Sequence, residues 1–461
     1  MNCTPVYDVC VIGAGVVGAA IARTLSHTSL SVALLEAGDD VGVGTSKANT
    51  AILHTGFDAT PGSLEARLLT RGYGLLRDYA AETGIAVEFT GALLIAWNAE
   101  QLSALPSIAE KARKNGVLDL VDISAEKVMA LEPSLGPGAL GGLLIPAESI
   151  ICPFSPPIAF AQEAVLNGVR LHLRTRVEGV EASGADKAHV LKTSQGDVQA
   201  RWVINAAGLR SDEIDQLFGH RRFKVTPRRG ELIVFDKLSR PLISRILLPV
   251  PTKTTKGVLV SPTVFGNLLL GPTAEDLPDK TNTSTSKTGL DLLLEKGRAI
   301  LPRLADEEVT ATYAGLRAAT EHSDYQIHLD ASQRYLCVGG IRSTGLSGSL
   351  GIAEYALELL SEAGLKSQKK AFIKTVKMPP LGHHQTRLSV EPRAVAANPD
   401  YGRIVCHCEQ VSRGELLDAM SSALPATTLD GLRRRTRCLQ GRCQGFYCQA
   451  EVSALLERQL P

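Results

Sequence analysis

The sequence predicts an α/β fold that is followed by a small, separate C-terminal unit. The first forty residues have the pattern strand, glycine-rich turn, helix and second strand, which is typical of a parallel sheet covered by helices. Two later apolar runs, Arg201–Asn205 and Tyr335–Gly339, have the composition of buried strands and end in small residues. Five of the nine cysteines fall within the last sixth of the chain, which indicates a compact unit with its own chemistry.

Length and composition limit the class of protein. The 461 residues suffice for two or three domains of ~100–200 residues each. Hydrophobic residues make up 44% and charged residues 21%, which excludes disordered and fibrous chains. The net charge of +1 gives no reason to expect a nucleic acid partner. No apolar stretch reaches the ~20 residues of a membrane span, and the N-terminus lacks the features of a secretory signal. We expect a cytoplasmic protein, whose association with a membrane would be made through a partner.

In chain order, the predicted elements begin with a strand–helix–strand unit and continue with a helix, several strands and a last helix. The buried strand Val6–Ile12 leads through a turn into the helix Val17–Leu25, and the strand Ser31–Glu36 follows. Leu64–Glu82 has the periodicity of a helix with one apolar face. The remaining predicted elements are the strands Ala92–Ile95, Gly142–Ile145, Arg201–Asn205, Gly230–Phe235, Gly257–Ser261, Asn267–Gly271 and Tyr335–Gly339 and the helix Gly351–Glu362.

The order of these elements predicts three regions. Residues 1–376 are expected to form one body, in which a second, mixed sheet is built roughly from 80–150 and 222–320. Residues 377–400 are expected to be a linker, because four prolines and a His-His pair leave little that could bury a face. Residues 401–461 are expected to form the last unit.

The last unit is small for an independently folded domain. A helix is predicted to begin near Ser412, because Glu415 follows three residues later as in a capping box. A unit of about sixty residues buries too little apolar surface to be very stable alone. A bound metal would supply the missing stabilisation.

A glycine-rich turn after the first strand predicts a dinucleotide site. Gly13-Ala14-Gly15-Val16-Val17-Gly18 is a GxGxxG motif: Gly13 allows the tight turn, Gly15 lets the backbone approach a pyrophosphate, and Gly18 lets helix and strand pack closely. The start of the helix offers N–H groups and a positive dipole end to the phosphates. Glu36, eighteen residues after Gly18, is placed to accept hydrogen bonds from ribose hydroxyls. The alternative, a glycine-rich turn without a ligand, does not explain this context.

Two later motifs distinguish FAD from NAD. Residues 203–208, Val-Ile-Asn-Ala-Ala-Gly, resemble the second flavin-contacting motif of the glutathione-reductase-like and D-amino-acid-oxidase-like flavoproteins. Residues 339–347, Gly-Gly-Ile-Arg-Ser-Thr-Gly-Leu-Ser, resemble their C-terminal flavin loop, which opens a helix near the pyrimidine end of the flavin. The chain is identified as a member of the D-amino-acid-oxidase/glycerol-3-phosphate-dehydrogenase flavoprotein family. The resemblance implies a glutathione-reductase-like FAD-binding domain with an inserted mixed-sheet substrate domain, and cofactor contacts from Ala207, Gly208, Gly340, Gly345 and Leu346.

The segment that follows the fingerprint unit contains a candidate base. Gly44–Phe57 resembles the loop that runs past the flavin in the glycerol-3-phosphate and L-2-hydroxyglutarate branches. The resemblance implies cofactor contacts from Thr45, Ser46 and Asn49 and puts His54 beside the flavin. A histidine with a near-neutral pKa suits removal of a hydroxyl proton as hydride leaves the adjacent carbon. Two alternatives remain open for this histidine: a core residue bonded to backbone, and covalent attachment to the flavin.

Three basic residues are candidates for binding an anionic substrate. Thr312–Arg317 resembles the family segment whose arginine binds a carboxylate or phosphate, and the planar guanidinium of Arg317 suits either group. Arg342, inside the flavin loop, is a second candidate. The stretch Thr252–Thr263 resembles the strand that roofs the pocket, and this implies that Lys256 points toward the substrate or the flavin N5 side. For each of the three, a solvated surface charge is the alternative.

The C-terminal cysteines predict a metal centre. Cys406 and Cys408 are separated by one residue, and Cys443 and Cys448 follow after thirty-four more. Four cysteines in two close pairs suit zinc or a [2Fe–2S] cluster, and the single-residue gap is too tight for the usual zinc knuckle. The segment resembles the bacterioferritin-associated-ferredoxin-like [2Fe–2S] domain that ends several flavoprotein dehydrogenases of this family, which implies these four cysteines as ligands. Zinc, or no metal, remains an alternative.

Two features of this segment leave questions open. Cys438 is an additional cysteine five residues before Cys443, and it could replace Cys443 as a ligand. The basic run Arg433–Arg437 precedes it directly. This run could bind nucleic acid, but in a net-neutral chain it more readily offsets the charge of the thiolates or docks a partner.

Together the motifs predict an FAD-dependent dehydrogenase acting on CH–OH donors. A flavin takes two electrons as a hydride and a [2Fe–2S] cluster takes one at a time, so a chain with both can pass electrons outward. The expected substrate is a small anionic alcohol of the glycerol 3-phosphate or L-2-hydroxyglutarate type, and the expected partner is an electron-acceptor protein or a second flavoprotein subunit. The alternatives are an amino-acid or opine dehydrogenase that oxidises a C–N bond, and a non-catalytic redox-sensing flavoprotein.

Overall fold

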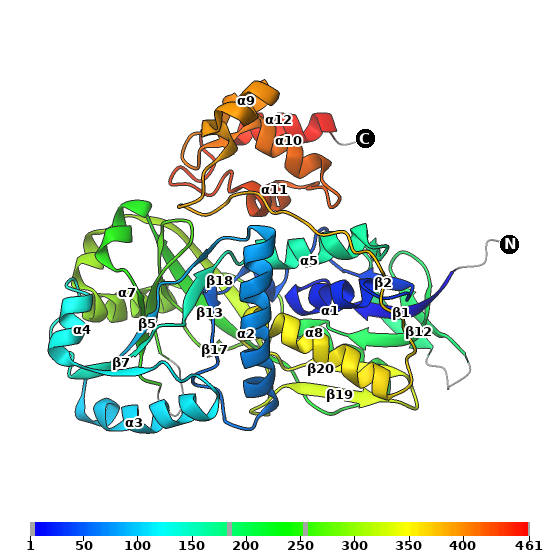
Figure 1. The fold of residues 1–461 in the computed structure, drawn as a ribbon, viewed down its shortest axis with the longest axis horizontal. Coiled ribbons are helices and arrows are strands. Elements are labelled where there is room, and N and C mark those ends of the chain that lie inside the picture. The colour runs from blue at the N-terminus through cyan, green and yellow to red at the C-terminus, as the bar shows by residue number, and fades with distance from the viewer. Residues whose placement is uncertain (1–4, 182–186, 252–256, 460–461) are drawn as a thin grey trace.

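The computed structural model of the chain describes residues 5–181, 187–251 and 257–459. Two large sheets and their helices form the body of the molecule, and a small C-terminal unit sits on one side of it (Figure 1). The predicted α/β class is therefore confirmed. Lys256, predicted to face the pocket, lies outside the described residues.

The first sheet has a parallel core with antiparallel strands at its margins. β1 pairs in parallel with β2 and β12, and β12 pairs in parallel with β20. In this register Ile12 lies level with Leu35 and with Asn205, so the carboxyl ends of three strands meet at one edge, where doubly wound sheets bind their ligands. The strands in pairing order are β10 (Val177–Glu181), β11 (His189–Thr193), β12 (Val198–Asn205), β1 (Val6–Ile12), β2 (Val32–Leu35) and β9 (Arg170–His172), with β20 (Tyr335–Gly339) and β19 (Gln326–Asp330) attached at β12.

The second sheet is mixed, as the sequence predicts for the inserted part. The long strands β13 and β18 pair antiparallel along almost their whole length, and β14 pairs in parallel with β5. The strands in order are β17 (Glu275–Asp276), β13 (Thr226–Phe235), β16 (Leu268–Gly271), β15 (Leu259–Pro262), β14 (Ile246–Pro249), β5 (Ala92–Ala96), β7 (Gly141–Ile145) and β6 (Val121–Ser124), with β18 (Val309–Ala319) on β13. The helices beside it are α3 (Ala99–Lys114), α4 (Ala125–Leu131) and α7 (Lys287–Ile300).

A third, three-stranded sheet lies between these regions of the chain and positions part of the site. It consists of β3 (Ile52–Leu53), β8 (Ser149–Ile151) and β4 (Val87–Glu88), with β8 in the middle. Ile52 pairs with Ile150, so the residues that follow β3 lie beside those that precede β8. This register brings His54 and Glu148, ninety-four residues apart in the chain, next to each other.

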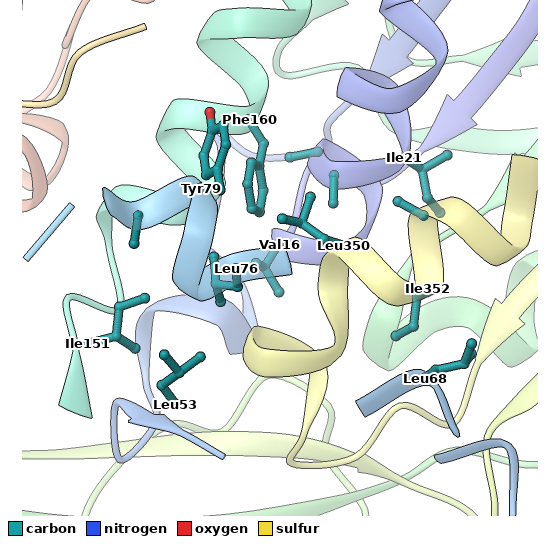
Figure 2. Packing of buried hydrophobic residues seen from close by; sticks show 14 of the residues in the cluster. Val16, Ile21, Leu53, Leu68, Leu76, Tyr79, Ile151, Phe160, Leu350 and Ile352 are labelled. Atoms are coloured by element: carbon teal, nitrogen blue, oxygen red, sulfur yellow. The ribbon is translucent and has the colours of Figure 1, made fainter. Parts of the chain in front are cut away.

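The main core lies where four helices pack together. These helices are α1 (Val16–Ser26), α2 (Leu64–Thr83), α5 (Ser155–Leu166) and α8 (Gly345–Glu362). Figure 2 shows their apolar side chains interlocking, among them Leu76, Tyr79 and Phe160. Helix α8 begins at Gly345, six residues before the predicted start at Gly351, because the glycine- and serine-rich first turns are buried against its neighbours rather than looped.

Glycines let α2 and α8 cross with their backbones nearly touching. A Cβ on Gly72 would lie 2.5 Å from the Ser347 carbonyl oxygen, and one on Gly351 would lie 2.3 Å from that of Leu68. Gly74, on the same helix as Gly72, has nothing within 4 Å of its Cβ position. The two glycines of α2 therefore differ only in whether they face the crossing.

The C-terminal unit has its own small core, built from residues such as Leu416, Leu432 and Val452. The predicted capping box is present, because Ser412 and Glu415 bond each other's backbone at the start of α10. The stretch 377–400, predicted as a linker, contains the 3-10 turn Leu388–Val390, a helix of six residues and the start of the 3-10 turn Pro399–Gly402. The elements are β21 (Ile404–Cys406), β22 (Val411–Ser412), α9 (Pro392–Ala397), α10 (Arg413–Ser421), α11 (Leu429–Thr436) and α12 (Gln449–Gln459).

Within the part of the chain that the structure describes, no helix combines the length and the apolar character needed to cross a bilayer.

The helix crossing makes a prediction about stability. Gly72→Ala should destabilise the protein by ~1–3 kcal/mol, because the added methyl would push the two backbones apart. Gly74→Ala, the matched control on the same helix, should be neutral or stabilise the protein by up to ~1 kcal/mol. Thermal unfolding of both variants measures the difference. Equal midpoints for the two variants would show that the crossing tolerates a side chain.

Candidate functional site

The turn after β1 is shaped to let a ligand approach the backbone. Gly13 has φ +99°, and a Cβ on it would lie 2.5 Å from the carbonyl oxygen of Ala206. A Cβ on Gly18 would lie 1.8 Å from the Gly13 carbonyl oxygen, so this position also requires glycine. Helix α1 starts at Val16, and its N-cap residue Gly15 has no side chain that could cap the helix. This arrangement suits a pyrophosphate.

Glu36 lies immediately after β2, at the same sheet edge. Its Oε2 accepts a hydrogen bond from the Ala14 N–H at 2.8 Å, and its Oε1 accepts one from the Gly38 N–H at 2.8 Å. Burial raises the pKa of this carboxyl, although the N–H donors oppose the rise. A half-buried carboxylate beside the glycine turn suits ribose hydroxyls as further donors, as the sequence predicts.

The second and third predicted flavin motifs come to the same place. Ala206, which precedes Ala207 and Gly208, donates its N–H to the Ile12 carbonyl at 2.9 Å. The second motif therefore lies beside the carboxyl end of β1. A Cβ on Gly345 would lie 3.7 Å from a methyl group of Val17, which puts the first turn of α8 against that of α1. Neither helix has an N-cap side-chain hydrogen bond. Two helix N-termini side by side, a glycine turn and a carboxylate fit an extended dinucleotide such as FAD.

The loop that contains Thr45, Ser46 and Asn49 joins this site to the second sheet. Ser46 Oγ accepts a hydrogen bond from the Val16 N–H at 2.9 Å. Thr45 Oγ1 donates to the Leu316 carbonyl of β18 at 2.8 Å. The Asn49 side chain bonds within the loop, to the Ser46 carbonyl and the Ala51 N–H. In this structure, of the three, Ser46 has the most direct contact with the cofactor turn.

His54 lies between two carboxylates. Its Nδ1 is 2.8 Å from Glu148 Oε1, and its Nε2 is 3.1 Å from Asp58 Oδ1. Its backbone N–H donates to Ser347 Oγ in the flavin loop, so the residue lies beside the start of α8. Burial acts to lower the pKa of His54, but the two carboxylates outweigh it and raise the pKa to about 10. The expectation of a near-neutral pKa is therefore wrong, because sequence alone did not place these partners.

Arg317 is half-buried on β18, next to a strand that makes room for it. Its Nη2 donates to the Thr273 carbonyl at 2.8 Å, and a Cβ on Gly230 would lie 2.6 Å from this nitrogen. Burial, assisted by the neighbouring Arg228, lowers the pKa of Arg317. Arg228 itself is held by Asp276 in a bidentate pair. A buried guanidinium whose described hydrogen bond is to a carbonyl can still accept an anion as partner.

Arg342 is held by a carboxylate. Its Nη2 lies 2.5 Å from Glu65 Oε2, and the same carboxylate accepts from the Thr344 hydroxyl at 2.8 Å. The residue has φ +52° and lies inside the flavin loop. The ion pair with Glu65 offsets the charge of Arg342, and its predicted contact with an anionic substrate stays a prediction.

The C-terminal cysteines gather as thiol pairs. Cys406 is buried beside Cys448. Burial, and to a smaller extent the neighbouring thiol, raises the pKa of Cys406 to about 11. Cys408 has Cys443 as its neighbour, and backbone N–H groups, first that of Tyr447, lower the pKa of Cys443. The described residues contain no group of three or more ligand side chains around one point that suits a single ion. Two pairs of thiols suit the four-cysteine ligation of a [2Fe–2S] cluster.

Cys438 belongs to one side of this group. It is fully buried, and burial raises the pKa of its thiol to about 12, with Cys406 and Cys448 contributing. Its thiol also contacts the Thr436 hydroxyl. Cys443 lies beside Cys408, whereas Cys438 lies beside Cys406 and Cys448, so the two candidates for this ligand have different neighbours.

The basic run of the C-terminal unit faces the rest of the chain. Arg434 and Arg435 are buried against Asp40, and the guanidinium of Arg437 lies 3.9 Å from the ring centroid of Phe265. Figure 1 shows α11, which carries two of these arginines, on the side of the unit that faces the body. The arginines therefore dock this unit on its own chain rather than offering a surface to nucleic acid.

Sequence reasoning missed several side chains of the site. Glu148 and Asp58, the partners of His54, have no local motif, and only the pairing of β3 with β8 brings Glu148 close. Tyr313 and Ser347 lay inside motifs already noted, and their side chains now prove to bond the Asn49 carbonyl and the His54 N–H. Asp40 follows the fingerprint unit, but its partners are almost four hundred residues away.

Comparisons with known proteins agree with this geometry. Residues 8–359 match the FAD dependent oxidoreductase family, and residues 404–458 match the BFD-like [2Fe-2S] binding domain. The chain therefore belongs to the FAD dependent oxidoreductase family and binds FAD and, in its C-terminal domain, a [2Fe–2S] cluster. Both cofactors were predicted from the sequence.

Individual relatives narrow the class to FAD-dependent dehydrogenases similar to glycerol 3-phosphate dehydrogenases. A glycerol 3-phosphate dehydrogenase of Caloramator mitchellensis is 35% identical over 98% of this chain and 94% of its own length. One subunit of the anaerobic glycerol-3-phosphate dehydrogenase of Haemophilus influenzae is 24% identical over 98% of this chain and 84% of its own. The FAD-bound L-α-glycerophosphate oxidase of Mycoplasma pneumoniae superposes with a TM-score of 0.77 at 28% identity, covering 81% of this chain and 99% of its own.

The raised pKa of His54 makes a prediction about pH and stability. A group whose pKa rises from the ordinary 6.5 to about 10 on folding stabilises the protein most below pH 6.5, and this contribution is lost as pH rises toward 10. The thermal midpoint of His54→Gln should therefore change less with pH between 6.5 and 10 than that of the wild type. His384→Gln, at a histidine whose side chain is 69% exposed, is the control and should follow the wild type. Parallel curves for all three proteins would refute the interpretation.

Proposed function

We propose that this protein oxidises the secondary hydroxyl of glycerol 3-phosphate to the ketone, and that the electrons leave through the [2Fe–2S] cluster. The observation that carries the proposal is that one loop connects a half-buried cation and a histidine–carboxylate group. Thr45 and Asn49 bond β18, the strand of Arg317, and the same loop continues into His54. A phosphate and a hydroxyl on neighbouring carbons need these two functions close together. The similarity to glycerol 3-phosphate dehydrogenases over nearly the full length supports this substrate.

Arg317 is proposed to bind the phosphate. Its guanidinium is planar and permanently charged, and it is held in place by the Thr273 carbonyl. Gly230 leaves room for Nη2 itself, so the guanidinium can lie close to the backbone of β13. Since a buried charge without a counterion is costly, the site favours an anion over a neutral alcohol.

His54 is proposed to take the hydroxyl proton at Nε2. Glu148 holds Nδ1 and stabilises the imidazolium that forms, while Asp58 can accept the hydrogen bond of the new Nε2–H. FAD supplies the acceptor for the hydride that leaves the same carbon, and the cluster supplies a one-electron carrier. Because the pKa is raised to about 10, the ring of the free protein already holds a proton, which must leave before each reaction.

Anaerobic titration tests the substrate. Glycerol 3-phosphate should bleach the flavin absorbance of the purified holoprotein, whereas L-2-hydroxyglutarate and glycine should not. Bleaching by L-2-hydroxyglutarate alone would exclude the proposed substrate, and bleaching by the amino acid alone would favour C–N oxidation. Flavin that stays oxidised with every compound would favour a redox-sensing role.

Substitution of Arg317 tests the anion site. Arg317→Gln should lower kcat/KM for glycerol 3-phosphate by ~10²-fold, mainly through KM, because a buried charge pair with the phosphate is lost. Arg228→Gln is the control, since Arg228 is the exposed partner of Asp276 on the paired strand. Similar losses in both variants would mean that general charge rather than a specific contact attracts the substrate.

The pH profile tests the base. Wild-type kcat/KM should rise with pH toward about 10, where His54 loses its proton. Glu148→Gln removes one of the charges that raise the pKa, so the rise should occur at lower pH. His54→Ala should slow the reaction ~10²–10⁴-fold at all pH values. If kcat/KM of Glu148→Gln rose at the same pH as that of the wild type, His54 would be excluded as the base.

Electron exit is proposed at the loop between Cys443 and Cys448. Phe446 and Tyr447 lie between these two proposed ligands and are 83% and 76% exposed. An acceptor protein that covers this aromatic pair would lie as near to the cluster as the chain allows. The similarity to a protein that is named as one component of a larger dehydrogenase supports a partner of this kind.

Substitution of the cysteines tests the ligand set. Cys406→Ser should abolish the electron paramagnetic resonance signal of the reduced cluster while FAD stays bound and substrate still bleaches it. Cys438→Ser, at a cysteine equally buried beside the same group, should retain the signal. Loss of the signal in Cys438→Ser together with its retention in Cys443→Ser would reverse the assignment.

A further inference from the structure

A buried cluster of charges joins the C-terminal domain to the FAD-binding body. Asp40 Oδ2 lies 2.5 Å from Arg434 Nη2 and 2.6 Å from Arg435 Nη1, and Asp40 Oδ1 accepts from Arg435 Nη2 at 2.9 Å. The three side chains are between 3% and 5% exposed. Arg434 also donates to the Val41 carbonyl at 2.7 Å. One carboxylate thus neutralises part of the charge of two buried guanidinium groups.

Asp40 belongs to the segment 38–47, which borders the dinucleotide turn at three points. Gly38 N–H donates to Glu36, the proposed ribose ligand, and Gly42 N–H donates to the Ala14 carbonyl at 2.9 Å. Further along, Ser46 Oγ accepts from the first N–H of α1. Hydrogen bonds on either side of Asp40 therefore connect its segment to Glu36, to the glycine turn and to the start of α1.

Helix α11 covers this segment on its outer side. Lys47 at the end of the segment pairs with Asp430 at 3.2 Å, and Asp430 also contacts Arg434. Gly42 lies against the same arginine, since a Cβ there would be 3.9 Å from its Nη1. The C-terminal domain thus touches the segment at its middle and at its end.

We propose that α11 clamps segment 38–47 over the bound FAD, so that docking of the iron–sulfur domain and retention of FAD are thermodynamically coupled through Asp40. Asp40 acts as a positioning residue: its carboxylate contacts the arginines, and the segment that carries it holds Glu36 and the glycine turn. If Asp40 loses its charge, two buried guanidinium groups remain without a full counterion. The resulting desolvation cost favours separation of α11 from the segment. The inference concerns the family cofactors and is independent of which substrate is oxidised.

Asp40→Asn in the full-length holoprotein tests the coupling. Release of FAD on dilution is measured by the rise of flavin fluorescence. It should be about tenfold faster than in the wild type, which is within the usual range of allosteric coupling. The control is Arg442→Gln, which also breaks a contact between the two regions, to Asp236 and Glu308, but away from the segment. It should release FAD at the wild-type rate. Equal release from wild type and Asp40→Asn would overturn the proposal.

Cleavage by trypsin reports on the docking itself. The run 433–437 is a tryptic site that the docked position shields, so Asp40→Asn should be cut there faster than the wild type while it still holds FAD. The contacts of Arg437 with Phe265 and of Lys237 with Glu409 remain in this variant and keep the domain attached. Faster release without faster cleavage would mean that Asp40 acts on FAD directly, which also overturns the clamp.

A second variant separates the clamp from simple misfolding. Arg435→Gln changes the opposite side of the contact, in a different domain, and should also accelerate FAD release. The double variant should release FAD no faster than Asp40→Asn alone, because both changes remove the same contact. Additive effects would show that the two residues act independently and would overturn the proposal. Retention of the cluster signal in each protein verifies that the C-terminal domain is folded.

Discussion

The near-contact of Gly13 with Ala206 is the constraint on which the rest of the molecule depends. Only a residue without a side chain lets the turn after β1 lie against the end of β12, since a Cβ would be 2.5 Å from the Ala206 oxygen. This contact brings the start of α1, Glu36 and the second flavin motif to one edge of the parallel sheet. Helix α8 then packs its first turn against that of α1, so two positive helix ends face the same ligand.

Buried charges mark the places where this framework does chemistry. His54 is held between two carboxylates, the half-buried Arg317 donates to a carbonyl, and Asp40 is paired with two arginines. Such groups cost stability unless they are paired, so their presence indicates functions that apolar residues could not supply. The first two belong to the proposed oxidation of an anionic alcohol. The third joins the two cofactor-binding parts of the chain.

Comparison with a shorter relative indicates what the contact between the two domains adds. The Mycoplasma oxidase is matched over 99% of its own chain but over 81% of this one, so its fold corresponds to a body that can exist without the iron–sulfur unit. In the present chain, α11 packs against segment 38–47, which borders the dinucleotide turn. A flavin and a one-electron carrier in one polypeptide need a defined separation, and the docked arginines of α11 provide a fixed contact between the two parts.

The sequence by itself determined the features that depend on neighbours in the chain: the strand–turn–helix of the fingerprint, the capping box at Ser412, the spacing of the paired cysteines, and with these the family and both cofactors. It misplaced the start of α8, because a run of glycines and serines looks like a loop until helices α1 and α2 pack against it. Only the tertiary structure decided that Glu148 lies beside His54, that Glu65 pairs with Arg342, and that the arginine run meets Asp40. These contacts join residues whose charges act through space, and no local pattern records a partner that the pairing of distant strands or the docking of a domain brings near.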